Sequence, residues 1–121
     1  MPPPPTCCDT VSVTLSGGAL ASQSGRAGLY TVVAGLMQNG RPVYQQTTGS
    51  KDYLYTYWSY GSYWQVGPDY RSSAASLHSD TNLASHCPKD AGTWTYWDGA
   101  TWQSGGVAID VTCATLSAVL L

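Results

Sequence analysis

The sequence predicts an all-β domain: an antiparallel meander of about eight strands that forms a sandwich or a partly closed barrel and is stapled by disulfides. Charged residues make up only 10% of the 121-residue chain and Glu is absent, which disfavours long solvent-exposed helices. Every aromatic residue is Tyr or Trp, a composition that suits half-buried strand faces. The four cysteines form an even number, as expected of a small domain closed by disulfides.

Period-two alternation and turn signals define the individual strands. The predicted strands cover residues 9–16, 29–37, 42–47, 52–58, 63–66, 93–97, 100–103 and 107–113. In the first, Val11 and Val13 lie on the face that turns inward. Residues 17–28 are rich in Gly, Ser and Ala and predict a loop. Asn39-Gly40 joins the second and third strands, because these residues accept the positive φ angles of a type I′ turn.

The middle of the chain combines an aromatic strand with a long segment that lacks alternation. Tyr53, Tyr55 and Tyr57 fall on one face of the strand at 52–58. Residues 69–89 have no apolar stripe of either period, so they predict a long loop with one short helical turn near 76–83.

The last third of the chain predicts a second hairpin and a clean final strand. Asp98-Gly99 is a hairpin signal of the same kind as Asn39-Gly40. The final strand has the most regular alternation in the chain. Its predicted inward residues are Val107, Ile109, Val111 and Cys113.

The cysteines predict two structural disulfides. We expect one of Cys7 and Cys8 to bond to Cys113 and the other to Cys87, with both pairings open. Either pairing closes loops of roughly 80 to 105 residues, worth about 4–5 kcal/mol in the chain-entropy model. A bridge to Cys113 would set the first strand antiparallel beside the last. Disulfides also predict an extracellular or cell-surface location.

Both termini differ from the predicted β domain at residues 7–113. Residues 1–6 form a polyproline arm, and an apolar strand at 114–121 follows the last core strand. That strand is too short to span a bilayer. It pairs either with an edge of its own domain or with the sheet of a neighbouring copy. The predicted subunit-contact residues are Leu116, Val119, Leu120 and Leu121.

Composition excludes several partners and chemistries. With a net charge of −2 and no basic stripe, the chain is not expected to bind nucleic acid or anionic membrane. Ser76, His78 and Asp80 are close in sequence but lie in one predicted loop, which rarely supplies triad geometry. Cys87 is expected in a disulfide, which removes thiolate chemistry. We therefore expect no catalytic residue, metal or cofactor.

The aromatic residues are the strongest candidate for a binding surface. They would stack on sugar rings if exposed, and would be core and cross-strand packing pairs if buried. The residues in question are Tyr53, Tyr55, Tyr57, Trp94, Trp97 and Trp102.

Several short motifs occur together between about residues 28 and 102. They are Asn39-Gly40-Arg41-Pro42-Val43-Tyr44, Tyr53-Leu54-Tyr55, Trp64-Gln65-Val66-Gly67, Cys87-Pro88, Trp94 and Trp102. In this order they resemble a small extracellular disulfide-bonded β domain found in secreted and surface proteins of protists, algae and marine animals. The resemblance implies class and location and brings no active site.

The N-terminal prolines carry a separate resemblance. Four prolines followed by Thr are similar to hydroxyproline-rich glycoprotein motifs of plants and algae. That similarity implies glycosylation on Pro2, Pro3, Pro4, Pro5 and Thr6.

Two functions of different classes follow from these features. The first is a non-enzymatic extracellular structural subunit that binds copies of itself head to tail, for example as a glycosylated fibre. The alternative is a carbohydrate-binding or adhesion module that uses exposed Tyr and Trp.

Overall fold

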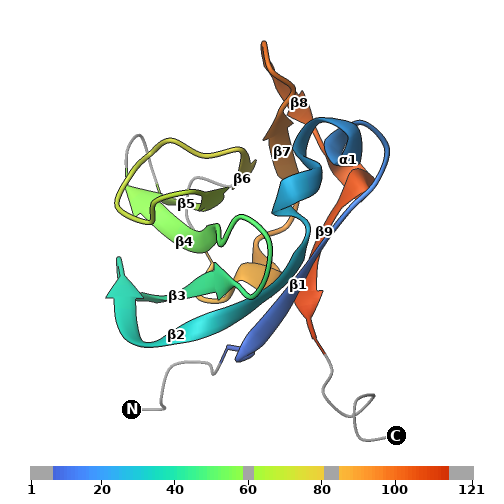
Figure 1. Cartoon of the computed structure of the whole chain (residues 1–121). Helices are drawn as coiled ribbons and strands as arrows, with labels where there is room; N and C mark the ends of the chain where they lie inside the picture. Colours follow the sequence, from blue (N-terminus) through green and yellow to red (C-terminus); the bar gives the residue numbers. More distant parts are fainter. Residues whose placement is uncertain (1–6, 59–61, 81–84, 115–121) are drawn as a thin grey trace, which may run out of the picture.

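The computed structural model of the chain describes residues 7–58, 62–80 and 85–114. In it, nine antiparallel strands form one sheet that curls into a half-barrel, in the order β8-β7-β6-β5-β4-β3-β2-β1-β9 (Figure 1). The strands are β1 (Thr10–Leu15), β2 (Gly28–Gln38), β3 (Arg41–Gln46), β4 (Tyr53–Trp58), β5 (Ser62–Gly67), β6 (Leu77–Ser79), β7 (Trp94–Trp97), β8 (Trp102–Ser104) and β9 (Ile109–Cys113). The helices are α1 (Gly17–Gln23) and three 3-10 turns, η1 (Ser24–Arg26), η2 (Pro88–Asp90) and η3 (Gly106–Ala108).

The predicted all-β, disulfide-stapled fold is confirmed, in the barrel-like form. From β1 to β8, strands consecutive in sequence pair with each other, and β9 pairs antiparallel with β1, with Val13 opposite Val111. That last pairing is the one expected from a bridge to Cys113. Eight of the nine strands lie at predicted positions, with ends shifted by a few residues, and β6 is the addition.

The predicted type I′ turn between β2 and β3 is also confirmed. Gln38 pairs with Arg41, and the two residues between them have φ angles of 54° at Asn39 and 74° at Gly40. Both values lie in the left-handed region that this turn requires. The local sequence therefore sets the register of the hairpin.

The concave face of the curled sheet holds the core. Its largest fully buried side chains include Trp64, Trp94 and Tyr30, packed with Leu54 and Leu77. With no Phe in the chain, aromatic residues with polar tips fill this role, and the tips find partners. The Tyr30 hydroxyl, for example, donates to the Arg26 carbonyl at 2.7 Å.

Residues 17–28, predicted to be a loop, instead contain α1 and η1. Burial of Ala19 explains the difference, because a small side chain lets the short helix approach the core. The helix also lies against β7, where Gln23 Nε2 donates to the Trp97 carbonyl at 2.6 Å. Tertiary contacts, rather than helix propensity, hold this seven-residue element.

The prediction of a loop with a helical turn near 76–83 is wrong over its first part. Leu77–Ser79 forms strand β6, which pairs with β5 on one side and β7 on the other. Three residues are too few to display alternation, so only their neighbours reveal the strand. Residues 81–84 lie outside the described part of the chain.

The final strand is shorter than predicted, and two of its four inward positions are wrong. Val107 lies in η3 with its side chain fully exposed, and Cys113 is exposed as well. Ile109 and Val111 are buried as expected. The 3-10 turn interrupts the alternation before the strand begins, and Cys113 leaves the core to meet its disulfide partner.

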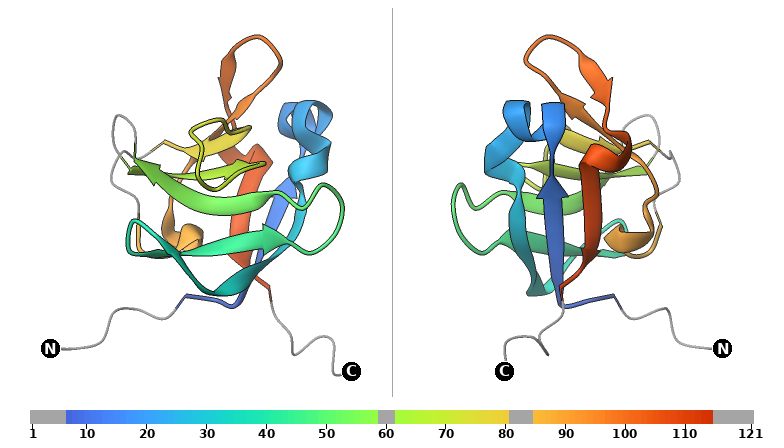
Figure 2. Two further views of the ribbon diagram at one scale, coloured as in Figure 1. Left: turned by 60° about the vertical axis from the view of Figure 1, so that its left-hand side comes forward. Right: turned by 90° about the vertical axis from the view of Figure 1, so that its right-hand side faces the viewer.

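The turn between β7 and β8 differs from the turn after Asn39. Trp97 pairs with Trp102, so four residues separate the strands instead of two. The Asp98 carboxylate closes this turn, since its Oδ1 accepts from the backbone N–H groups of Ala100 and Thr101, both at 2.8 Å. The β7–β8 hairpin projects beyond the barrel, at the end of the molecule opposite to where the described chain begins and ends (Figure 2).

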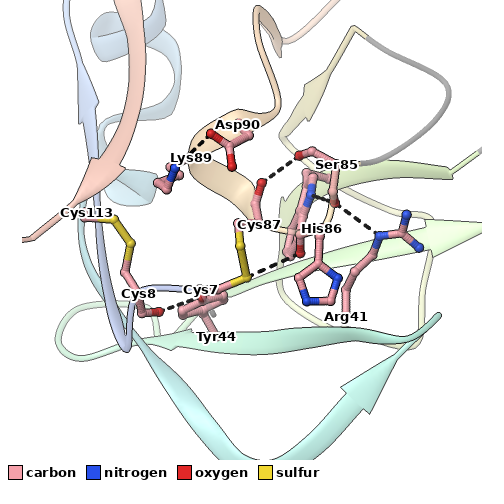
Figure 3. Close-up of a disulfide and its surroundings, with 11 residues drawn as sticks. Cys7, Cys8, Arg41, Tyr44, Ser85, His86, Cys87, Lys89, Asp90 and Cys113 are labelled. Atoms are coloured by element: carbon pink, nitrogen blue, oxygen red, sulfur yellow. Dashed lines mark hydrogen bonds and ion pairs between the residues drawn. A yellow bond between two sulfur atoms is a disulfide. The ribbon is translucent and has the colours of Figure 1, made fainter. Parts of the chain in front are cut away.

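Both predicted disulfides are present, and the pairing left open by the sequence is Cys7–Cys87 and Cys8–Cys113 (Figure 3). The Cα atoms of these pairs lie 5.3 Å and 5.7 Å apart. The Tyr44 hydroxyl donates to the Cys8 carbonyl at 2.7 Å and so fastens the bridged segment to β3. The two bridges therefore join the start of β1, the end of β9 and the segment before η2.

Candidate aromatic binding site

The four strands β5 to β8 have one face toward the core and one toward solvent. Backbone register separates the two faces, because residues directly opposite each other on paired strands point to the same side. Trp64, Leu77 and Trp94 occupy the core face and are buried. Gln65, His78, Thr95 and Ser104 form one continuous line of partners across the outer face.

Four aromatic side chains contact one another in sequence across this outer face. We call Tyr63, His78, Trp102 and Trp97 the aromatic row. Ring centroids lie 5.6 Å apart from Tyr63 to His78, 4.4 Å from His78 to Trp102 and 5.5 Å from Trp102 to Trp97. Each contact is edge to face, the arrangement that aromatic quadrupoles favour.

The row is open to solvent at the hairpin end. Trp102 retains 43% of its accessible surface and Trp97 retains 36%, while Tyr63 and His78 are half-buried. Adjacent strands are about 4.8 Å apart, so a row that crosses from β5 to β8 extends over roughly 14 Å. That length makes it a strip rather than a single-ring pocket.

Polar groups fix the imidazole at the centre of the row. His78 Nδ1 lies 2.8 Å from the Ser79 carbonyl, which can only accept, so Nδ1 carries the proton in this arrangement. Nε2 then accepts from the Thr95 hydroxyl at 3.0 Å. The ring is therefore oriented by neighbours on β6 and β7, and it contacts the ring of Trp102.

One buried polar atom beside the row has no partner. Gln65 is opposite His78 on the outer face and retains only 8% of its surface. Its Oε1 is the only fully buried side-chain oxygen or nitrogen without a hydrogen bond in the described part of the chain. An unpaired buried acceptor is costly and marks a position where a donor would be favourable.

Beyond Gln65, the outer face is covered by the loop at residues 68–76. The Tyr55 hydroxyl donates to the Ser72 carbonyl at 2.7 Å, and the ring of Tyr70 meets that of Tyr53 at 5.2 Å. Gly67 permits this approach, because a Cβ there would lie 2.6 Å from the Ala74 carbonyl oxygen. Burial, with a smaller effect of Asp69, raises the pKa of Tyr55.

These positions correct the predicted set of stacking residues. Tyr55 and Trp94 are fully buried and do not reach a ligand. Tyr53 and Tyr57 are half-buried on β4, so of the predicted set only Trp97 and Trp102 combine exposure with mutual contact. Tyr63 and His78 were not among the stacking residues predicted from the sequence.

Two carboxylates flank the row. Asp80 follows β6 two residues after His78, and its Oδ2 accepts from the Thr93 hydroxyl at 2.6 Å. Asp98 lies in the turn next to Trp97, and the backbone N–H groups of Thr101 and Ala100 hold the pKa of its carboxyl below the usual range. The five Lys and Arg residues all lie outside β5 to β8.

The catalytic candidates weighed in the sequence do not assemble. Ser76 Oγ accepts from Arg26 Nε at 3.1 Å, away from the imidazole of His78, whose ring bonds to Thr95. Cys87 is bridged and 2% exposed. Within the described residues, no three His, Cys, Asp or Glu side chains come together as metal ligands.

Two predicted sites fall outside the described residues. They are the glycosylation positions Pro2, Pro3, Pro4, Pro5 and Thr6, and the subunit contacts Leu116, Val119, Leu120 and Leu121. Among the helices that are described, none is both long and apolar enough to cross a bilayer. No family model, curated protein or solved structure matches the chain.

Proposed function

We propose that this chain is a non-enzymatic, extracellular carbohydrate-binding module that holds its ligand on the aromatic row. The observation that carries the proposal is the continuous contact of Tyr63, His78, Trp102 and Trp97 on the outer face, with both Trp rings open to solvent. Aromatic faces stack on the apolar faces of pyranose rings, and the polar tips of Tyr, His and Trp bond to sugar hydroxyls.

A purely structural role for the two exposed Trp rings explains less of the geometry. A cross-strand pair such as Trp97 and Trp102 stabilises a hairpin by roughly 0.5–1.5 kcal/mol. The ring contacts continue, however, beyond the β7–β8 hairpin to His78 on β6 and to Tyr63 on β5. Stabilisation of the hairpin does not require these further contacts. A strip of this length is better explained by binding of a linear ligand than by stabilisation of one turn.

The disulfides support the proposed location. Two bridges in one small domain are typical of proteins that fold in an oxidising compartment. At the cell surface or outside it, polysaccharides are the most abundant ligands with extended apolar ring faces, which suits the row.

Substitution of the most exposed ring tests the proposal. Trp102→Ala should lower the affinity for an insoluble polysaccharide by about tenfold, equivalent to about 1.4 kcal/mol. The measurement is a depletion isotherm against cellulose, chitin and β-1,3-glucan particles. Leu29→Ala is the matched control, because Leu29 is apolar, 45% exposed and on β2, outside the row.

Thermal melting of both variants shows whether each remains folded. Since Trp102 lies on the edge strand β8, its loss should leave the disulfide-bonded core intact. If the unmodified protein binds none of the three particles, or if both variants lose affinity equally, the aromatic row is not a sugar site.

A structural subunit is the second candidate, favoured by the position of β9. This strand is an edge of the described sheet, and the apolar segment at 114–121 continues directly from it. A strand given to a neighbouring sheet edge would produce a head-to-tail contact that propagates into a fibre. In this proposal Leu116, Val119, Leu120 and Leu121 are the subunit contacts, and Pro2–Thr6 carries O-linked sugar.

Electron microscopy of the purified chain separates this candidate from the first. The structural proposal expects filaments without added ligand, and their loss when residues 114–121 are deleted. Unassembled particles at high concentration, or filaments that persist after the deletion, would eliminate strand exchange through this segment.

A further inference from the structure

We infer that the aromatic row selects neutral polysaccharides and rejects anionic ones, and that Asp80 and Asp98 impose this selection. The inference rests on the proposed carbohydrate-binding function and adds the chemical class of the ligand. It follows from which polar groups the outer face of β5 to β8 offers and from the sign of the charges that flank it.

The polar groups beside the row are mainly acceptors. The carboxylates of Asp80 and Asp98 are exposed. Gln65 Oε1, next to His78, is buried without a partner. A neutral sugar carries hydroxyl groups that donate hydrogen bonds, whereas a carboxylate or sulfate substituent only accepts. A hydroxyl-rich ligand therefore matches this surface, and an acidic substituent does not.

The charges on the two flanks strengthen the same preference. Asp80 lies on the face of His78, and Asp98 directly follows Trp97. The hydrogen bonds to Asp98 lower the pKa of its carboxyl, so it stays ionised in mildly acidic solution. The β5–β8 strands contain no Lys or Arg to balance these charges.

The arginine on the covering loop at residues 68–76 is already engaged. Arg71, on the covering loop, is bonded to Asp69 at 3.2 Å and lies over the ring of Tyr70. Arginine recognises acidic sugars through bidentate contacts to their charged groups. The guanidinium of Arg71 already makes an ion pair with the carboxylate of Asp69.

The two carboxylates already accept hydrogen bonds from neighbouring groups of the protein. Asp98 accepts from Ala100 N and Thr101 N through Oδ1, and from Gln103 Nε2 at 3.0 Å through Oδ2. Asp80 is bonded to Thr93. Both carboxylates flank the row, so at a distance they repel an anionic chain and attract a cationic one, an effect that salt screens.

Three soluble polymers with related backbones test the inference by affinity gel electrophoresis. Hydroxyethylcellulose is neutral, carboxymethylcellulose carries acidic groups on the same backbone, and glycol chitosan carries amines. We expect retardation by hydroxyethylcellulose, and at least fivefold weaker retardation by carboxymethylcellulose at low salt.

The double variant Asp80→Asn/Asp98→Asn should bring the two cellulose derivatives to within twofold of each other. Asn keeps an acceptor for Thr93 and for the turn, so the hairpin should remain folded. Each removed charge should raise carboxymethylcellulose binding about threefold, as expected for unit charges roughly 7 Å apart in water. About 1 M salt should have the same effect in the unmodified protein, because it reduces the screening length to about 3 Å.

The control variant is Asp9→Asn/Asp110→Asn, which changes the net charge equally on exposed positions of the β1–β9 side. It should alter carboxymethylcellulose binding by less than twofold.

Equal binding of both cellulose derivatives by the unmodified protein, or an equal response of the two double variants, overturns the inference and leaves the sugar site standing. A preference for glycol chitosan that persists in about 1 M salt replaces it with a cation site. No binding to any of the three soluble polymers or to any of the three particles refutes the proposed function itself.

Discussion

The two disulfides, together with the chain from Cys87 to Cys113, close one small covalent ring. Their contributions to stability are therefore not those of two independent bridges. Cys7 and Cys8 are adjacent, and Cys87 and Cys113 are 26 residues apart (87 to 113). If one bridge is removed while the other remains, the lost constraint is a ring of roughly 27 residues, whichever bridge is chosen. The variants are Cys7→Ala/Cys87→Ala and Cys8→Ala/Cys113→Ala.

The magnitude follows from the loop lengths. Closing a ring of roughly 27 residues is worth about 3.5 kcal/mol in the chain-entropy model, so each double substitution should lower the free energy of unfolding by that amount. The last remaining bridge closes a loop of 80 or 105 residues, worth about 4.5–5 kcal/mol. Loss of both should therefore cost about 8 kcal/mol, which is comparable to the whole stability of an ordinary domain.

Guanidinium denaturation followed by Trp fluorescence measures these values, since Trp64 and Trp94 are buried in the core. The two singly bridged proteins should agree within about 1 kcal/mol, despite their different sequence separations. Both should show a larger m-value than the parent because their unfolded chains are less confined. If one bridge costs nothing and the other more than about 5 kcal/mol, shared ring closure is not what the bridges contribute.

Alkaline pH should unfold the protein. Burial raises the pKa of Tyr30 and Tyr55, and raises that of Tyr44 to about 12, so the folded state holds these protons more tightly than the unfolded state. Stability should be constant below the unfolded pKa of 10.0 and fall toward pH 12 by about 1.4 kcal/mol per pH unit for each tyrosine; circular dichroism that keeps its native signal up to pH 12 would contradict this. Gly67→Ala should cost about 1–3 kcal/mol through its clash with the covering loop, whereas Gly25→Ala should stay within about 0.5 kcal/mol by the same denaturation assay.

The sequence predicts the fold well where its signal is local. Alternation finds β1 and its buried residues Val11 and Val13, and Asn39-Gly40 defines a turn whose φ angles the structure reproduces. The cysteines predict that the first and last strands are neighbours, which is a long-range statement, because covalent pairing carries that information independently of periodicity.

Elements that depend on their neighbours were not predictable in the same way. Strand β6 is three residues long and exists because β5 and β7 lie on either side of it. The aromatic row inherits this difficulty, since His78 belongs to β6 and joins Tyr63 to Trp102 only after the sheet has formed. Adjacent residues of a strand point to opposite faces, so the position of Tyr63 next to Trp64 in the predicted strand is the one signal that the sequence offers.

Burial of tyrosine was the other source of error. Alternation correctly put Tyr53, Tyr55 and Tyr57 on one face of β4. It cannot reveal that the loop at 68–76 folds back over that face and covers Tyr55, because such a contact depends on the tertiary path of the chain. The sequence therefore predicts which aromatic residues share a face of a strand. Whether that face is exposed depends on which loops pack over it.

The bridge between Cys8 and Cys113 has a mechanical consequence. Tension applied at the two ends of the described chain enters at Cys8, crosses the sulfur–sulfur bond and leaves at Cys113, whose Cα atoms are 5.7 Å apart. The 105-residue stretch of chain between them would extend to about 350 Å, but it does not carry the load. Under oxidising conditions the domain behaves as an inextensible link, and the sheet that carries the aromatic row bears none of the force.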